Sequence, residues 1–240
     1  MFRTAYESIL TLVYPQECRV CGNSVEKSSD GIACGECWER VRIFNGEEIL
    51  CEKCGAYQGS SGKSQGVSCR QCVDHNYDRA HAAGIYEHAL AATILGLKSN
   101  SHLCRRTRDI LFSTYAAAVL DDVTSIIPVP LSRKRFHERG FNQAEIIAAL
   151  LNKHFGVPVK NDILVRRSHT PMHRSAMDKK AREITVRNVF EIKKGAEIKG
   201  AYILLVDDVF TSGATVSSCA KILKKNGASR VDVLTLARAV

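Results

Sequence analysis

The sequence predicts an α/β protein in which a mostly parallel sheet is flanked by helices and preceded by a small cysteine-rich module. Apolar strand-like runs alternate with helical patterns from residue 81 onward, as in a parallel sheet covered on both faces. Eight of the 10 cysteines lie within the first 72 residues. The formal net charge of +9 is the sum of −3 up to Asp78 and +12 after it. We therefore expect two parts, residues 1–78 and 79–240.

Composition narrows the class of protein. The 240 residues suffice for one substantial domain and a small one. The sequence has no apolar run of the ~20 residues that span a bilayer, and its start lacks the features of a signal peptide. We expect a cytoplasmic protein without a transmembrane segment, where disulfides are disfavoured. The positive charge of residues 79–240 indicates an anionic partner, either a phosphate-bearing small molecule or nucleic acid. A solvated basic surface is the alternative interpretation.

The N-terminal part has little regular periodicity. Residues 2–13 predict a short helix with apolar residues near one face, ended by Pro15. Residues 18–72 predict metal-binding knuckles and turns, and 55–68 form a glycine- and serine-rich excursion.

The second part alternates between the two periodicities. The expected strands are 81–88, 125–130, 163–167, 186–192, 201–208 and 230–239. The expected helices are 89–99, 106–120, 141–156 and 217–227. Ligands of such sheets bind beyond the carboxyl ends of the strands. The acidic pair at the end of the strand 201–208 is therefore a candidate binding feature.

Eight cysteines form four C-x-x-C pairs, the spacing of thiolate knuckles that bind Zn²⁺. The simplest pairing is sequential, and an interleaved pairing of first with third and second with fourth also fits the spacing. Four-thiolate sites leave no open position for water, so both zinc ions are expected to be structural. A redox dithiol is the minor alternative, and His75 is interpreted as a surface histidine. The sequential ligand sets are Cys18, Cys21, Cys34 and Cys37, and then Cys51, Cys54, Cys69 and Cys72.

The stretch "ILLVDDVFTSGATV" places two carboxylates and a small-residue loop after an apolar strand. The loop 211–215 precedes a helix, so its backbone N–H groups and the helix dipole can bind a phosphate. Gly213 permits close approach of the backbone to a ligand. Two carboxylates beside a phosphate site suit a ribose 5-phosphate. The alternative is an ordinary helix N-cap after a strand.

This stretch closely resembles the phosphoribosyl-pyrophosphate motif of type I phosphoribosyltransferases. The resemblance implies that Asp207 and Asp208 bind the ribose 2- and 3-hydroxyls and are the catalytic residues. It also implies that the loop residues bind the 5-phosphate and that Mg²⁺ accompanies the substrate. These loop residues are Thr211, Ser212, Gly213, Ala214 and Thr215.

A second stretch, "IIPVPLSRKRFHERGFNQAEIIA", resembles the signature of the ComF family, which is associated with bacterial competence. That resemblance implies a type I phosphoribosyltransferase-like domain joined to an N-terminal double zinc ribbon. The basic residues after the strand 125–130 are expected in a loop that binds the leaving pyrophosphate, with Arg133, Arg139 and Gly140 as its binding residues. A solvated basic loop is the alternative.

The basic segment 166–187 matches the place of a mobile lid in the fold family. The family resemblance implies binding of phosphoribosyl pyrophosphate, phosphoribosyl transfer to an acceptor that the sequence does not identify, and a link to DNA uptake. Two other classes stay open: a protein that handles single-stranded DNA, and a ligand-sensing regulator. Single-stranded DNA is an expected partner of the basic edge, and other competence proteins are expected partners of the zinc module.

Overall fold

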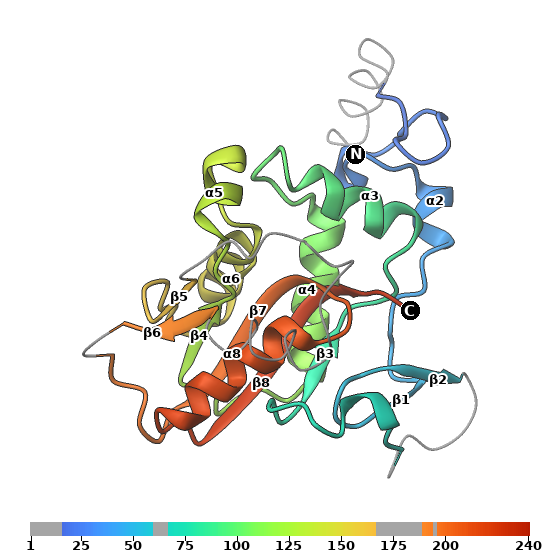
Figure 1. The fold of residues 1–240 in the computed structure, drawn as a ribbon. Helices are drawn as coiled ribbons and strands as arrows, with labels where there is room; N and C mark the ends of the chain where they lie inside the picture. The colour runs from blue at the N-terminus through green and yellow to red at the C-terminus, as the bar shows by residue number, and fades with distance from the viewer. Residues whose placement is uncertain (1–15, 60–66, 167–188, 194–195) are drawn as a thin grey trace, which may run out of the picture.

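The computed structural model describes residues 16–59, 67–166, 189–193 and 196–240 (Figure 1). The expected helix 2–13 and the expected lid beyond Arg166 lie outside these ranges, as do the first three residues of the expected strand 186–192.

The centre of the molecule is a four-stranded parallel sheet in the order β3-β8-β7-β4. The two long strands are almost completely buried, β7 up to its acidic pair and β8 after its first residue. This burial explains the continuous apolar run at the start of β7. Tyr202 pairs with Arg230 and Phe210 with Arg238, so the carboxyl ends of β7 and β8 lie together. The strands are β3 (Ala80–Ala82), β4 (Ser125–Pro128), β7 (Tyr202–Phe210) and β8 (Arg230–Arg238). The predicted α/β class with a mostly parallel sheet is confirmed.

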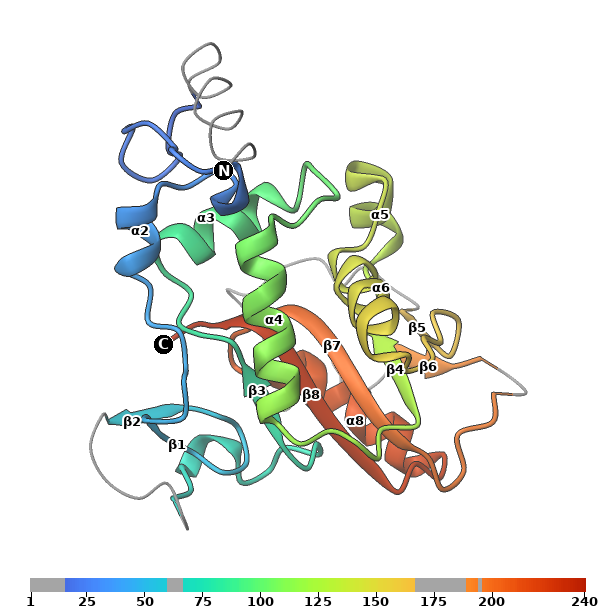
Figure 2. The same ribbon diagram turned by 180° about the vertical axis from the view of Figure 1, so that it is seen from behind.

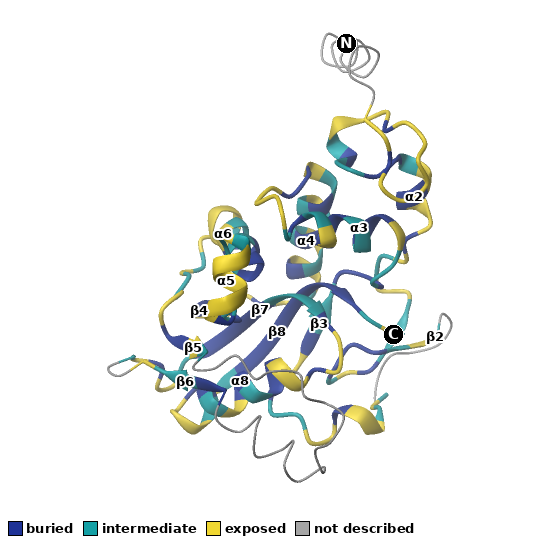
Figure 3. Cartoon of the chain, turned by 45° about the horizontal axis from the view of Figure 1, so that its top comes forward, coloured by how far each residue is buried: buried dark blue, intermediate teal, exposed yellow. Residues whose placement is uncertain are grey.

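Helices cover both faces of this sheet, as Figures 1 and 2 show from opposite sides. On one face, α3 (His88–Gly96), α4 (Arg105–Ala117) and α6 (Gln143–Phe155) pack against alternate residues of the strands. On the other face, α8 (Ala214–Lys225) packs against the residues between them. Burial colouring shows the dark sheet between partly exposed helices (Figure 3). None of the helices in the described ranges is long and apolar enough to cross a lipid bilayer.

The cysteine-rich part forms two small units that join different faces of the sheet. The first unit contains η1 (Ser28–Asp30) and α2 (Gly35–Glu39), and its apolar residues join the core beneath α3 and α4. The second contains β1 (Ile49–Leu50), β2 (Tyr57–Gly59) and η2 (Arg70–Cys72), and it joins the core beneath α8. The predicted boundary after residue 78 stays a prediction.

Three expected strands differ from their patterns. In place of the expected strand 81–88, β3 ends at Ala82, Gly84 and Ile85 form isolated bridges with Ile43 and Arg238, and α3 begins at His88. The expected strands 163–167 and 186–192 are seen as β5 (Leu164–Arg166) and β6 (Phe190–Ile192). These two pair antiparallel with each other, outside the main sheet.

Candidate functional site

The eight C-x-x-C cysteines gather in two groups of four, in sequential order along the chain. In each group the four sulfur atoms lie within 4.8 Å of one another. Neighbouring sulfurs are 3.6 Å apart for Cys21 and Cys34, and 3.5 Å apart for Cys54 and Cys69. Tetrahedral Zn²⁺ with Zn–S bonds of ~2.3 Å needs sulfurs ~3.8 Å apart. Both groups therefore fit a structural zinc ion, and the interleaved alternative does not describe this structure.

The surroundings of the first cysteine in each group favour its thiolate form. The amide of Cys34 donates to Cys18 Sγ at 3.3 Å, and the amide of Cys69 donates to Cys51 Sγ at 3.3 Å. Burial raises the pKa of both thiols, but backbone N–H groups outweigh it and lower the pKa of Cys18 and Cys51 to about 6. Because zinc binds thiolates, this arrangement favours metal binding near neutral pH.

Asp207 and Asp208 lie within β7, two residues before its end, rather than directly after the strand. The neighbouring strand β4 stops at Pro128, opposite Val206. Beyond that point the carboxylates accept hydrogen bonds from the chain itself: Asp207 Oδ1 from the Asp208 amide at 2.9 Å, and Asp208 Oδ1 from the Val209 amide at 2.7 Å. Both side chains are half-buried at the carboxyl edge of the sheet. The early end of β4 thus leaves the acidic pair accessible to a ligand.

The environment of Asp207 favours its protonated form. Burial, and then the neighbouring charge of Asp208, raise the pKa of Asp207 to about 8. The positive charge of Arg166 opposes this shift. An unliganded site therefore holds one proton near neutral pH, and a ligand that donates hydrogen bonds to this carboxylate favours loss of that proton.

Replacing Asp207 alone with asparagine should stabilise the unliganded protein relative to wild type, by an amount that increases as the pH rises. A carboxyl group with a folded pKa near 8 and an unfolded value of ~3.9 makes wild-type stability fall between these two pH values. Asparagine does not titrate, so the melting temperature of Asp207→Asn minus that of wild type should grow between about pH 6 and pH 9. Each kcal/mol corresponds to about 2–4 °C for a chain of this size. Calorimetric scans across this range test the effect. A pH-independent difference, like the one expected for the exposed Asp121→Asn, would contradict it.

Residues 211–213 connect β7 to α8, and Ala214 and Thr215, which were expected in the loop, form the start of the helix. The whole segment 211–215 is open to solvent except at Gly213. Gly213 has φ +74° and is the N-cap residue of α8, without a side-chain cap. The first backbone N–H groups of a helix have no partner within the helix. Ser212 Oγ takes only a long bond of 3.5 Å from the Ala214 amide. The loop therefore presents amides and hydroxyls close to the acidic pair, as a phosphate site requires.

The basic residues after β4 form a helix, so the predicted loop is wrong. This helix, α5 (Arg133–Arg139), begins where Ser132 Oγ accepts from the Arg135 amide at 3.3 Å and ends at Gly140, with φ 77°. Arg133 is exposed, whereas Arg139 donates to Gln143 Oε1 at 2.9 Å. The helix follows the end of β4, so it lies at the same edge of the sheet as the acidic pair, beside α6 (Figure 3). The structure brings the three predicted pyrophosphate residues to this edge, without direct contact to the carboxylates.

Arg166 is a candidate site residue that no sequence motif identifies individually. It ends β5, and its guanidinium lies 5.4 Å from the centre of the Phe190 ring. Burial, and then the charge of Arg135, lower its pKa, while the charge of Asp207 opposes the shift. Its buried Nε has no hydrogen-bond partner among the described residues. The only sequence signal was its place at the start of a basic segment.

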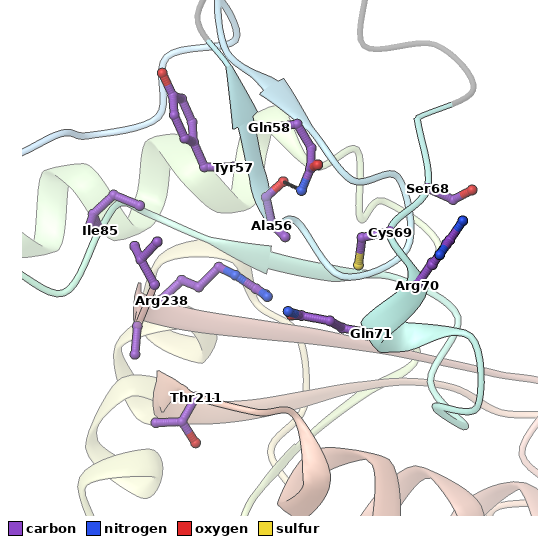
Figure 4. A pocket seen from close by; sticks show the side chains of 12 residues that line it. Ala56, Tyr57, Gln58, Ser68, Cys69, Arg70, Gln71, Ile85, Thr211 and Arg238 are labelled. Atoms are coloured by element: carbon purple, nitrogen blue, oxygen red, sulfur yellow. Dashed lines mark hydrogen bonds between the residues drawn. The ribbon is translucent and has the colours of Figure 1, made fainter.

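A pocket of about 660 Å³ lies between the second cysteine unit and the loop that follows β7. Figure 4 shows Gln58, Cys69 and Gln71 of that unit around the Arg238 side chain, with Thr211 on the opposite side. Asp207 and Asp208 are not part of its lining. Arg238 Nη1 donates to the Cys54 carbonyl at 2.5 Å, and its guanidinium lies 4.5 Å from the Phe210 ring centre. A buried cation thus joins the second cysteine unit to the carboxyl end of the sheet.

Comparisons with known proteins match both parts of the chain. The double zinc ribbon domain model matches residues 9–73, and the phosphoribosyl transferase domain model matches residues 138–239. Competence protein F of Haemophilus influenzae is 28% identical over 231 residues, which cover 92% of this chain and 96% of that protein. Competence protein ComFC of Bacillus subtilis is 27% identical over 225 residues, 87% of this chain and 85% of the relative. The chain is therefore similar to these competence proteins over most of its length.

These matches join the two sets of candidate residues in one architecture. The two cysteine groups are those of a double zinc ribbon, and the acidic pair with its loop lies in the phosphoribosyltransferase-like domain. Among solved structures, a purine phosphoribosyltransferase from Pyrococcus horikoshii Ot3 aligns over 57% of this chain and 89% of its own length. The identity is 17% and the TM-score 0.37.

Proposed function

We propose that this protein is a member of the ComF family and binds phosphoribosyl pyrophosphate with Mg²⁺ at the carboxyl end of β7. The observation that carries the proposal is the adjacent pair Asp207 and Asp208, accessible beyond the end of β4 and followed by the uncapped turn at Gly213. Carboxylates suit ribose hydroxyls, and free helix amides suit a 5-phosphate. A single ligand that carries a ribose and a 5-phosphate would use both groups.

The remaining charges suit the leaving group. The amides and hydroxyls of residues 211–215 would hold the 5-phosphate, and α5 with Gly140 would face the pyrophosphate through Arg133 and Arg139. Arg166, whose charge interacts with that of Asp207, would add a positive group beside the ribose. Mg²⁺, when bound with the substrate, would neutralise part of the pyrophosphate charge. Positioning and electrostatics of this kind supply most of the catalysis in such transfers.

A turnover assay tests whether the site transfers the phosphoribosyl group. The zinc-loaded protein would be incubated with phosphoribosyl pyrophosphate, Mg²⁺ and a panel of purine, pyrimidine and other nucleophiles, and pyrophosphate release would be measured. Release that depends on one nucleophile identifies the acceptor. Binding without release for any nucleophile would contradict transfer and favour a ligand-sensing role for the same site.

A second function is favoured by the exposed basic surface of α5. Its residues are solvent-exposed except for the last, and two relatives bear the names competence protein F and competence protein ComFC. We propose that this edge binds single-stranded DNA during DNA uptake in the cytoplasm, and that the acidic zinc module contacts other competence proteins. The basic residues of α5 are Arg133, Lys134, Arg135, His137 and Arg139.

The DNA affinity should depend on salt and compete with phosphoribosyl pyrophosphate. Each backbone phosphate neutralised should add roughly 0.7 to the magnitude of the log–log salt slope. Arg133→Gln with Arg135→Gln should lower the magnitude of that slope by the amount that corresponds to about one to two phosphate contacts. Lys221→Gln with Lys225→Gln, which changes two exposed cations of α8, should leave it unchanged. Fluorescence anisotropy with a labelled oligonucleotide measures both effects. DNA binding that persists at saturating phosphoribosyl pyrophosphate would show that the two ligands do not share a site.

A further inference from the structure

We propose that the second zinc ribbon is part of the phosphate site. Residues 75–78, which follow its last cysteine, hold the phosphate loop in position, so zinc binding at Cys51, Cys54, Cys69 and Cys72 is linked to phosphate binding. The inference rests on the proposed binding of phosphoribosyl pyrophosphate and assigns this segment as its positioning residues.

His75 packs directly against the phosphate loop. Its amide donates to the carbonyl of the zinc-ligand residue Cys72 at 3.1 Å. On its other side, a Cβ atom added at Gly213 would lie 2.9 Å from His75 Cε1 and 2.6 Å from Phe210 Cζ. The imidazole is therefore half-buried against the loop, and it lies outside the second group of zinc ligands. One residue thus touches both the zinc ribbon and the phosphate turn.

Tyr77 holds the His75 imidazole in place and contacts the end of β7. Its hydroxyl shares a hydrogen bond of 2.6 Å with His75 Nδ1. Its ring, which is 1% exposed, meets the Phe210 ring edge-on with centres 5.9 Å apart. Since Phe210 directly precedes the phosphate loop, Tyr77 defines where that loop begins.

Asn76 ties the ribbon to the first turn of α8. Its backbone amide and its side-chain Nδ2 both donate to Ser217 Oγ, at 3.0 and 3.1 Å. Ser217 is 6% exposed, and its own amide donates to the Gly213 carbonyl at 2.9 Å. At the other end of the same helix, Asp78 forms a 2.7 Å ion pair with Lys224. The segment therefore holds α8 at both ends and sets the direction of its N-terminal amides.

The first zinc ribbon provides an internal control. Its buried residues pack with α3 and α4, on the face of the sheet opposite to α8. Its Asp30 accepts from Arg106 of α4 at 3.4 Å, and Gly31 lies against Cys104. The two ribbons are chemically alike, but only the second contacts the phosphate loop among the described residues.

Linkage makes the inference measurable in both directions. If the second zinc stabilises the phosphate loop, a ligand bound to that loop must stabilise the second zinc by the same factor. Saturating phosphoribosyl pyrophosphate with Mg²⁺ should therefore raise the zinc affinity of the second cluster, measured at equilibrium against a zinc-selective chelator, by about tenfold, within the usual range of such couplings. The zinc affinity of the first cluster should not change.

Matched variants assign the effect to a cluster. Cys21 and Cys69 are the most exposed ligands of their clusters. Cys69→Ser should weaken binding of phosphoribosyl pyrophosphate by about tenfold or more, and Cys21→Ser by less than about twofold. Zinc content and melting temperature of each variant show that only one metal has been lost.

A milder set of variants avoids the loss of metal. Ser217→Ala, which removes both hydrogen bonds from Asn76, should weaken binding about tenfold with both zinc ions retained. Asn76→Ala keeps the bond from the backbone amide and should weaken binding less, and the double variant should be no weaker than Ser217→Ala alone. Ser218→Ala, which removes a neighbouring hydroxyl bonded only within α8, should bind like wild type.

The outcomes separate this inference from the function on which it rests. Wild-type protein that does not bind phosphoribosyl pyrophosphate would overturn both. Wild-type binding with unchanged affinity in Ser217→Ala, together with a zinc affinity of the second cluster that the ligand does not change, would overturn the positioning role alone.

Discussion

Replacing Asp207 and Asp208 together with asparagine is expected to weaken binding of phosphoribosyl pyrophosphate by about a hundredfold or more. Each carboxylate accepts a charge-assisted hydrogen bond from a ribose hydroxyl, and such bonds contribute ~1.5–3 kcal/mol. Two of them correspond to at least two orders of magnitude in the dissociation constant. Titration calorimetry in the presence of Mg²⁺ measures the change.

The chain contains a matched control for this experiment. Asp121 and Asp122 are also adjacent, and both are exposed in a turn. Asp121→Asn with Asp122→Asn makes the same chemical change and the same change in net charge, and it should bind like wild type. Equal losses in the two double variants would attribute the effect to overall charge, and equal retention would place the ribose elsewhere.

Loss of one zinc ligand in the first ribbon is expected to have the largest effect on stability. Wild-type protein should contain two zinc ions per chain by elemental analysis, because each group of four sulfurs fits one ion. Cys34→Ser should retain one zinc and unfold the first ribbon at a much lower temperature. Structural zinc supplies as much as ~10–16 kcal/mol to small zinc-folded peptides.

Cys104→Ser is the control for that substitution. Cys104 lies outside both groups, and its sulfur is 3.1 Å from Thr107 Oγ1, a contact that a serine hydroxyl can keep. This variant should retain two zinc ions and nearly wild-type stability. One zinc or none in folded, reduced wild-type protein would contradict the double-ribbon interpretation.

The sequence could predict the parts of the fold that follow from local pattern. The buried strand before Asp207 is a continuous apolar run, and the helix 217–227 corresponds to α8, which begins three residues earlier. The helix α5 was missed because its residues have no apolar stripe. Its caps, Ser132 and Gly140, were present in the sequence as signals.

The arrangement of the two zinc ribbons could not be obtained from spacing alone. Sequential and interleaved pairings use the same C-x-x-C knuckles, and the structure separates them because the sulfur atoms gather in two sequential groups that pack on opposite faces of the sheet. The contact of Asn76 with Ser217 joins residues 141 positions apart, so no local pattern could reveal it. The same holds for His75, whose partners are Tyr77 and a glycine of the distant phosphate loop.

The acidic pair shows both what the sequence can predict and what only the folded structure determines. Its motif identified the candidate site from sequence, but its accessibility depends on where β4 ends, and its proton depends on burial beside Asp208. Neither property can be read from residues 203–216 alone. The motif predicts which groups would bind a ligand, whereas the end of the neighbouring strand β4 makes the two carboxylates accessible.

A crystal structure of the zinc-loaded protein with phosphoribosyl pyrophosphate and Mg²⁺ tests the central claim most directly. We expect the ribose hydroxyls on the carboxylates of Asp207 and Asp208, and the 5-phosphate on the amides of residues 211–215. A ligand bound at any other place, with these carboxylates and amides facing only solvent, would contradict the account.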